Sequence, residues 1–276
     1  MLFKQFVLDE FLPFASTDKS QTYKSDLKPI SEFFGEMEFS AITPLLIERF
    51  KRQRMSTVSR FGKPLAPATV NHELMTLSRV CGLARQAKLI RRNPCRKVKL
   101  LQLDNERKRY LSKEEEVRLM ETLQGKTWLK RIVVFALHTG MRRGEIVNLK
   151  WSDVDLKENI LRVQKSKSGR SRVIPVNQPA RNVLLDILLE REEKTEKIFL
   201  VSGNSITSAF MEARIKAGLT DFRFHDLRHT FASRLAMHGQ DIITLAELLG
   251  HADINMTKRY THASDESKRK AVEMLE

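Results

Sequence analysis

The sequence predicts a mainly α-helical chain of 276 residues in two domains, the second containing a small β-sheet or hairpin. Apolar residues recur at helical spacing through the first hundred residues, and strand signals are absent there. A polar, basic stretch without periodicity follows, and only one later segment alternates as strands do. We therefore expect a helical domain at 1–98, a basic linker at 99–109 and an α+β domain at 110–276.

The first domain is expected to contain helices near 2–14 and 20–34, followed by two more. Thr43 and Pro44 form a cap and a first helical position, because proline's missing N–H costs nothing in a first turn. The longest helix is expected at 68–88. Its apolar positions follow helical spacing and are Val70, Leu74, Leu77, Val80, Cys81 and Ala84.

The opening apolar stretch is better explained by a core-facing helix than by a signal peptide. Asp9 and Glu10 interrupt it, and no small-residue cleavage site follows. The two cysteines, Cys81 and Cys95, have neither metal-ligand spacing nor a disulfide pattern, which fits a reducing cytosol. No apolar run reaches membrane-spanning length. We expect a cytoplasmic protein without a membrane partner.

The second domain is expected to open with a capping box of Ser112 and Glu115. The segments 159–164 and 171–176 flank a glycine-containing loop and predict a β-hairpin. The predicted helices lie near 128–139, 143–149, 179–193, 205–217, 226–238, 241–249 and 254–263.

The charge distribution indicates a polyanionic partner. Lys and Arg number 49 against 34 Asp and Glu, a net charge of +15. The segment 49–108 alone carries 16 basic against 3 acidic residues. A local basic stripe suits DNA, because each phosphate contact releases condensed counterions. A linker this basic could lie against DNA or be a solvated tether. The basic side chains expected to contact phosphates are Arg49, Lys51, Arg52, Arg54, Arg60 and Lys63.

Two short motifs carry candidate functional residues. TGMRRGEI at 139–146 places Arg142 at a helix start, where backbone N–H groups favour a phosphate. HDLRHTFASRL at 225–235 places His225 and Arg228 on one helix face. His225 and His229 also have the spacing of a zinc pair, but the glutamate of HExxH is replaced by aspartate and no third ligand is evident. We expect His229 to pack or cap within the fold.

A third motif, LLGHADINMTKRYTH at 248–262, places His251 nine residues before Tyr260. An isolated tyrosine would be an ordinary half-buried aromatic residue. Tyrosine is rare in this chain, however, with only three present, and Tyr260 follows two basic residues between flanking histidines. This context favours a chemical role.

Taken in order, these motifs and the hairpin segment SKSGRSRVIP resemble those of the tyrosine recombinases, the phage integrase family. The resemblance extends over essentially the whole chain, with TVNHELMTLSRVCGLARQAKLIRRNP similar to the exit of the family's core-binding domain. It implies a helical, SAM-like core-binding domain followed by an α+β catalytic domain. The catalytic residues that it implies are Arg142, Lys167, His225, Arg228, His251 and Tyr260, with Glu145 as an acidic support residue. Lys165 is the rival to Lys167, which is preferred because it precedes Ser-Gly and lies five residues before Arg172.

The resemblance also implies a mechanism without metal or organic cofactor. Two guanidiniums suit the charged non-bridging oxygens of a phosphodiester under attack by Tyr260. His225 would take the phenol proton, Lys167 would protonate the departing 5′ oxygen, and His251 would bind the phosphate. A 3′-phosphotyrosyl link conserves the bond energy, so that another 5′-hydroxyl can reseal the DNA without ATP.

The partners that the resemblance implies are double-stranded DNA with inverted-repeat core sites and further copies of the chain. Four protomers would pair two sites and exchange strands through a Holliday junction, with accessory DNA-bending proteins as further candidates. The protein would be monomeric in solution and nucleoid-associated in the cell. The segment after Tyr260 is similar to a helix that docks on a neighbouring protomer, or is a solvated last helix. The core-binding domain begins almost at Met1, which indicates either an enzyme for simple sites or a shortened chain.

Two alternatives stay open. A type IB topoisomerase uses similar chemistry, but the chain length and the LLGH motif favour a recombinase. A DNA-binding protein or a recombination directionality partner without catalysis would bind DNA independently of Tyr260, and would form no covalent adduct.

Overall fold

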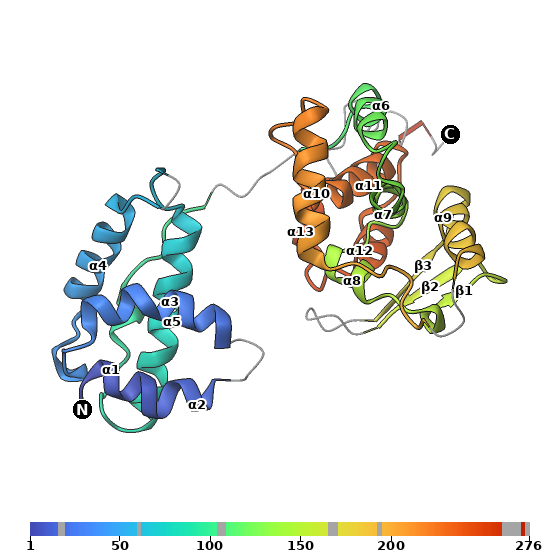
Figure 1. The fold of residues 1–276 in the computed structure, drawn as a ribbon. Coiled ribbons are helices and arrows are strands. Elements are labelled where there is room, and N and C mark those ends of the chain that lie inside the picture. Colours follow the sequence, from blue (N-terminus) through green and yellow to red (C-terminus); the bar gives the residue numbers. More distant parts are fainter. Residues whose placement is uncertain are drawn as a thin grey trace. The chain divides into compact units, whose positions relative to one another are not determined.

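A computed structural model describes residues 1–15, 20–59, 62–103, 109–164, 171–191, 195–260 and 272–273, with only the backbone at 20–22. The chain divides into two compact units, Met1–Asn105 and Glu106–Glu276 (Figure 1). The division falls within the segment 99–109 that we expected to be a linker. The predicted fold class, mainly helical with one small sheet, is confirmed.

The first unit is helical, as predicted. Its helices are α1 (Phe3–Phe6), α2 (Leu12–Phe14), α3 (Ser20–Phe34), α4 (Pro44–Ser56) and α5 (Pro67–Gln86), with a π-helical turn at Val7–Phe11 and 3-10 turns at Phe39–Ala41 and Pro94–Lys97. The expected cap of α4 is present, since the Thr43 hydroxyl accepts the Leu46 N–H at 3.3 Å. All six apolar positions predicted on α5 are buried.

The core of the first unit is rich in phenylalanine. Phe6 meets Phe39 edge-on with ring centroids 5.0 Å apart, and Phe34 packs on Phe50 at 5.4 Å. Such pairs add about 1 kcal/mol each beyond the area that they bury. Phe3 and Phe6 are fully buried, which confirms that the opening helix faces a core.

The chain leaves the first unit along α5. The Asn71 side chain donates to the Leu101 carbonyl and accepts the Leu101 N–H, both at 2.8 Å. The Lys51 ammonium donates to the Lys99 carbonyl at 3.0 Å. Residues 99–101, the first part of the expected linker, are thus hydrogen-bonded to the first unit.

The second unit surrounds the buried helix α7 (Thr127–Thr139), which packs against α9 (Gln178–Leu189) and α11 (Asp226–Met237). The other helices are α6 (Lys113–Thr122), α8 (Arg143–Asn148), α10 (Gly203–Lys216), α12 (Ile242–Leu249) and α13 (Asn255–Lys258), with a 3-10 turn at Trp151–Asp153. The capping box on α6 is confirmed, with Ser112 and Glu115 exchanging two hydrogen bonds at 3.1 and 3.2 Å.

The sheet contains one strand more than predicted. The hairpin is confirmed as β2 (Ile160–Val163) paired antiparallel with β3 (Arg172–Pro175). A third strand, β1 (Val154–Asp155), pairs antiparallel with β2. Two residues are too few for an alternating pattern, so pairing with the neighbouring strand defines this element. Helix α9 also ends earlier than predicted, at Leu189.

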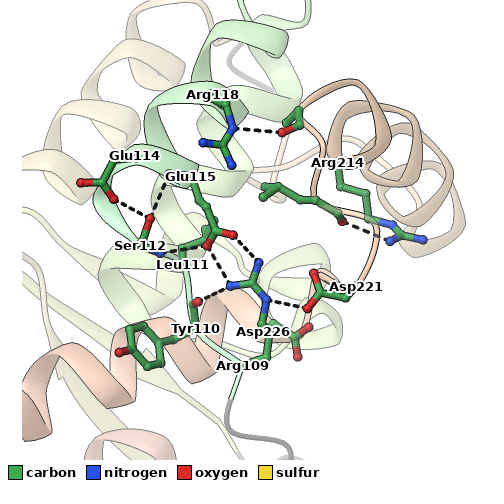
Figure 2. Close-up of polar contacts among 12 residues, drawn as sticks. Arg109, Tyr110, Leu111, Ser112, Glu114, Glu115, Arg118, Arg214, Asp221 and Asp226 are labelled. Carbon is green, nitrogen blue, oxygen red and sulfur yellow. Dashed lines mark hydrogen bonds and ion pairs between the residues drawn. The ribbon is translucent and has the colours of Figure 1, made fainter.

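Polar contacts of Arg109 hold the first described residues of the second unit in place (Figure 2). The Arg109 guanidinium donates two hydrogen bonds to Glu115, at 2.7 and 2.8 Å, and one to Asp221 at 2.9 Å. It also lies 5.2 Å from the centre of the Phe222 ring. Two residues on, the Leu111 N–H donates to the Thr230 hydroxyl on α11 at 3.0 Å. The start of the unit is therefore fixed to α11, which begins after His225 and carries Arg228 in its first turn.

Candidate active site

Two helix C-termini hold the Arg228 guanidinium. It is 3% exposed, and it donates to the Gly140 carbonyl at 2.8 Å and to the Leu249 carbonyl. The last carbonyls of a helix lack intrahelical partners and carry partial negative charge, so they suit a buried cation. Burial, followed by the charges of Arg142 and Arg172, lowers the pKa of Arg228 to about 9. The guanidinium therefore stays charged at neutral pH.

Glycines make these two helix ends possible. Gly140 ends α7 at φ +62° and Gly250 ends α12 at φ +63°, in the left-handed region that glycine tolerates best. A Cβ at Gly140 would lie 2.4 Å from the Phe231 ring, and one at Gly250 would lie 2.9 Å from the Arg172 side chain. Both positions thus require a residue without a side chain for conformation and for space.

Glu145 on α8 links two further arginines. Its carboxylate accepts two hydrogen bonds from Arg172, at 2.7 and 3.0 Å, and one from the Arg142 guanidinium at 3.0 Å. It also accepts the Arg142 backbone N–H at 2.8 Å. Burial alone would raise the pKa of Glu145, but the hydrogen bonds and charges of Arg172 and Arg142 outweigh it and lower the pKa to about 2. Glu145 is therefore ionised and orients both guanidiniums.

Arg172 was not among our predicted site residues, yet its side chain is only 5% exposed. Besides Glu145, it donates from Nε to the Leu248 carbonyl at 2.9 Å, at the same end of α12 that binds Arg228. A signal was present in the sequence. Arg172 lies two residues before the buried Ile174 on a strand, so both side chains point to one face of the sheet.

The two predicted histidines, His225 and His251, lie close enough to these arginines for the arginine charges to lower their pKa values. His251 is 8% exposed, and its Nδ1 lies 2.8 Å from the Thr257 hydroxyl, so a contact to a phosphate would have to use Nε2. Burial and the arginine charges lower the pKa of His251 to about 3. His225 stays accessible to solvent. Partial desolvation of its ring by the surrounding protein, followed by the charge of Arg228, also lowers its pKa.

Tyr260 follows α13 and is the last of the predicted site residues along the chain. Its hydroxyl is hydrogen-bonded to Nδ1 of His229, a residue that we expected to have only a packing or capping role. Burial raises the pKa of Tyr260, while the charges of Arg259 and Arg228 oppose this rise. The phenol is therefore protonated at neutral pH and lies close to two cations.

Arg142, His225, Arg228, His251 and Tyr260 thus come together in the second unit. The arginine charges act on both histidines, and that of Arg228 also acts on the phenol. Lys167 and its rival Lys165 lie outside the described residues. The cluster gathers cations around a half-buried hydroxyl, an arrangement that can bind a phosphate and present a nucleophile to it.

The side chains of the first unit that we expected to contact phosphates differ in their exposure and in their partners within the fold. Arg49, Arg52 and Lys63 are exposed. Arg54 instead donates two hydrogen bonds, at 2.7 and 2.8 Å, to Glu73, whose side chain is only 3% exposed. This bidentate pair gives Arg54 a role within the fold. Lys51 is bound by Glu48 and the Lys99 carbonyl, and Arg60 lies outside the described residues.

Among the residues that the structure describes, no group of three His, Cys, Asp or Glu residues is placed to hold a metal ion. No helix in the same ranges is both long and apolar enough to cross a bilayer.

Comparison with known proteins identifies the family of the chain. The model of the phage integrase family matches residues 109–267, more than half of the chain. The chain belongs to this family. The match includes every predicted catalytic position, from Arg142 to Tyr260.

Relatives of this phage integrase family member include named recombinases. The shufflon-specific DNA recombinase of Escherichia coli is 32% identical over 225 residues, which are 80% of this chain and 58% of the relative. The integrase of Salmonella phage P22 is 33% identical over 217 residues, 72% of this chain and 55% of the relative. The chain thus spans little more than half the length of these two. Tyrosine recombinase XerC of Thermodesulfovibrio yellowstonii is 27% identical and is covered over 92% of its length.

Solved structures show the same fold. A lambda integrase dimer bound to a COC′ core site matches with a TM-score of 0.77 at 22% identity, covering 93% of this chain and 94% of the other. A Tn1549 transposon integrase in complex with circular intermediate DNA matches with a TM-score of 0.79 at 21% identity, covering 99% of each chain.

Proposed function

We propose that this family member is a site-specific DNA recombinase that cleaves and rejoins DNA through a 3′-phosphotyrosyl intermediate. The observation that carries the proposal is the clustering of Tyr260 with Arg142 and Arg228, residues from three separate motifs. A phosphodiester under attack carries negative charge on its non-bridging oxygens, and fixed guanidiniums stabilise that charge more in the transition state than in the ground state.

In this proposal the arginines are held in place before DNA arrives. Arg228 is fixed by two backbone carbonyls, while Arg142 is fixed by Glu145 and stays partly exposed, with 28% of its side chain accessible. Such prior ordering matters because a cation that is already oriented needs no reorganisation during the reaction. Glu145 and Arg172 act as positioning residues behind Arg142.

Tyr260 would attack the phosphorus, so that the Oη–P bond forms as the bond from phosphorus to the 5′ oxygen breaks. The phenol proton would pass to His225, and Lys167 would give a proton to the departing 5′ oxygen. His251 would bind the phosphate through Nε2. Resealing is the reverse reaction with a different 5′-hydroxyl, and two rounds exchange both strand pairs through a Holliday junction.

DNA binding would extend over both units. We assign residues 1–98 as the core-site binding domain, 99–109 as the linker and 110–276 as the catalytic domain. The exposed basic side chains Arg49, Arg52 and Lys63 would contact phosphates on core sites arranged as inverted repeats. A lambda integrase tetramer bound to a Holliday junction has the same fold, with a TM-score of 0.73, and supports a tetramer on DNA. Accessory DNA-bending proteins are a further part of the proposal.

The experiment is covalent capture. The protein is incubated with genomic DNA fragments of its host, the reaction is stopped with detergent, and the DNA that stays attached to protein is sequenced. The Tyr260→Phe variant is the control, because it keeps the aromatic ring and removes only the hydroxyl.

Adducts at one or a few short inverted-repeat sites, absent from the variant, are the expected result. Adducts scattered over all sequences would instead indicate a type IB topoisomerase. Binding without any adduct would contradict both enzymes and favour a DNA-binding protein.

A further inference from the structure

The hydrogen bond between His229 and Tyr260 is not explained by the roles assigned above. His229 lies on α11, one residue after Arg228, and Tyr260 lies 31 residues later in the chain. The two ring centroids are 5.7 Å apart, and the contact joins Nδ1 of the imidazole to the phenol oxygen. His229 therefore contacts the atom that would attack the DNA.

The protonation states decide what this contact can do. Burial and the charges of His225 and Arg259 lower the pKa of His229 to about 4, so its imidazole is neutral near pH 7. With its pKa this low, the imidazole of His229 binds a proton weakly, so this contact does not require His229 to take the phenol proton. A neutral imidazole can still donate a hydrogen bond from Nδ1, as the neutral electrophilic histidine of triosephosphate isomerase polarises a carbonyl.

We propose that His229 donates its Nδ1–H to the Tyr260 oxygen and stabilises the negative charge that this oxygen carries during cleavage and resealing. The proposal rests on the function proposed above and adds a catalytic residue to it. A donor fixed on the reacting oxygen stabilises the phenolate character that develops there.

The proton balance assigns different tasks to His225, the N-cap residue of α11, and to His229 in its first turn. During cleavage the phenol proton goes to His225, whose solvent-accessible ring can pass it on, while the Nδ1–H of His229 stays in place. During resealing the Oη–P bond breaks, electrons return to the phenol oxygen, and His225 returns the proton. The two rings are adjacent and meet edge-on, with centroids 5.1 Å apart.

The direction of the hydrogen bond can be measured without DNA. Protein labelled with ¹⁵N-histidine is compared by NMR with its Tyr260→Phe counterpart, with His229→Asn used to assign the resonance. We expect the wild-type spectrum to place the proton of His229 on Nδ1, and we expect this signal to shift when the acceptor oxygen is removed. A proton on Nε2, or a signal that ignores the Tyr260 substitution, would overturn the proposal.

The catalytic consequence is tested with two variants. In His229→Asn the side-chain amide takes the place of Nδ1 and can donate, whereas His229→Leu has similar bulk and no donor. Using a DNA fragment captured by the wild type, we expect leucine to slow adduct formation and resealing about 100-fold, the usual loss for one such donor. Asparagine should stay within about tenfold of the wild type.

The outcomes separate this proposal from the proposed function. Leucine as fast as wild type, or asparagine as slow as leucine, would contradict the donor role of His229. Equal binding of a captured DNA fragment by all three proteins shows that the variants are folded. If the wild type itself forms no adduct, the proposed function fails, and the NMR comparison still decides whether the hydrogen bond runs from His229 to Tyr260.

Discussion

Replacing Glu145 by glutamine removes the carboxylate that Arg142 and Arg172 share and keeps its shape. The Glu145 side chain is 8% exposed and that of Arg172 is 5% exposed, so the pair is buried. Removing one partner of a buried ion pair is strongly destabilising, because the other charge is left without compensation. We therefore expect Glu145→Gln to reduce the stability of the second unit.

The magnitude follows from the pKa of Glu145. Folding lowers this pKa from 4.5 to about 2, and each tenfold change in proton affinity corresponds to about 1.4 kcal/mol. The charged form of Glu145 thus contributes about 3 kcal/mol at neutral pH. The usual cost of breaking a buried pair, about 3 to 5 kcal/mol, is of similar size.

Tryptophan fluorescence can report this loss in the full chain. The sequence contains two tryptophans, Trp128 and Trp151, and both lie in the second unit. Urea unfolding followed by their emission therefore reports on that unit. The matched control is Glu196→Gln, which removes a carboxylate from an exposed pair with Lys150 and should leave the urea midpoint nearly unchanged.

The effect of pH has a definite sign. A carboxylate whose folded pKa is lowered contributes stability above its unfolded pKa of 4.5, and this stability is lost as the pH falls towards 2. The difference in unfolding free energy between wild type and Glu145→Gln should decrease from about 3 kcal/mol at pH 7 to about 1.4 kcal/mol at pH 3. A midpoint shift no larger than that of the control, or a pH-independent difference, would refute the reasoning.

Three further predictions concern other parts of the chain. Gly140→Ala places a Cβ against the Phe231 ring at positive φ and should lower the stability of the second unit by about 2 kcal/mol, measured by the same urea assay. Arg52→Gln removes one expected phosphate contact and should reduce the slope of log affinity against log salt concentration on duplex DNA by about 0.9. It should leave the unfolding free energy unchanged, because the Arg52 side chain is exposed. Arg54→Gln should lower the melting temperature of the first unit by circular dichroism, because Glu73 is left buried without its partner; an unchanged transition would contradict this role.

Local signals made several elements predictable. The Thr43 cap and the capping box of Ser112 and Glu115 depend on residues within three positions of each other, and the structure contains both. Strand β1 was missed because its two residues carry no pattern and its pairing with β2 forms only in the folded chain. The prediction placed the end of α9 at residue 193, whereas the helix ends at Leu189.

The motifs of the site were predictable from the sequence, but the contacts between residues of different motifs were less so. Motif order selected Arg142, Arg228 and Tyr260, which the structure brings into one cluster. The salt bridge from Arg172 to Glu145 joins residues 27 apart in sequence, and the contact from His229 to Tyr260 joins residues 31 apart. Such partners depend on how strand and helices pack, which single-sequence periodicity does not encode.

The identity of the residue that becomes linked to DNA tests the central claim most directly. Captured adducts would be digested with nuclease and trypsin, and the peptides would be sequenced by mass spectrometry. We predict a nucleotide remnant on Tyr260, in the tryptic peptide that begins after Arg259, and no modified peptide from Tyr260→Phe. A remnant on any other residue, or an adduct that persists in the variant, would contradict the account.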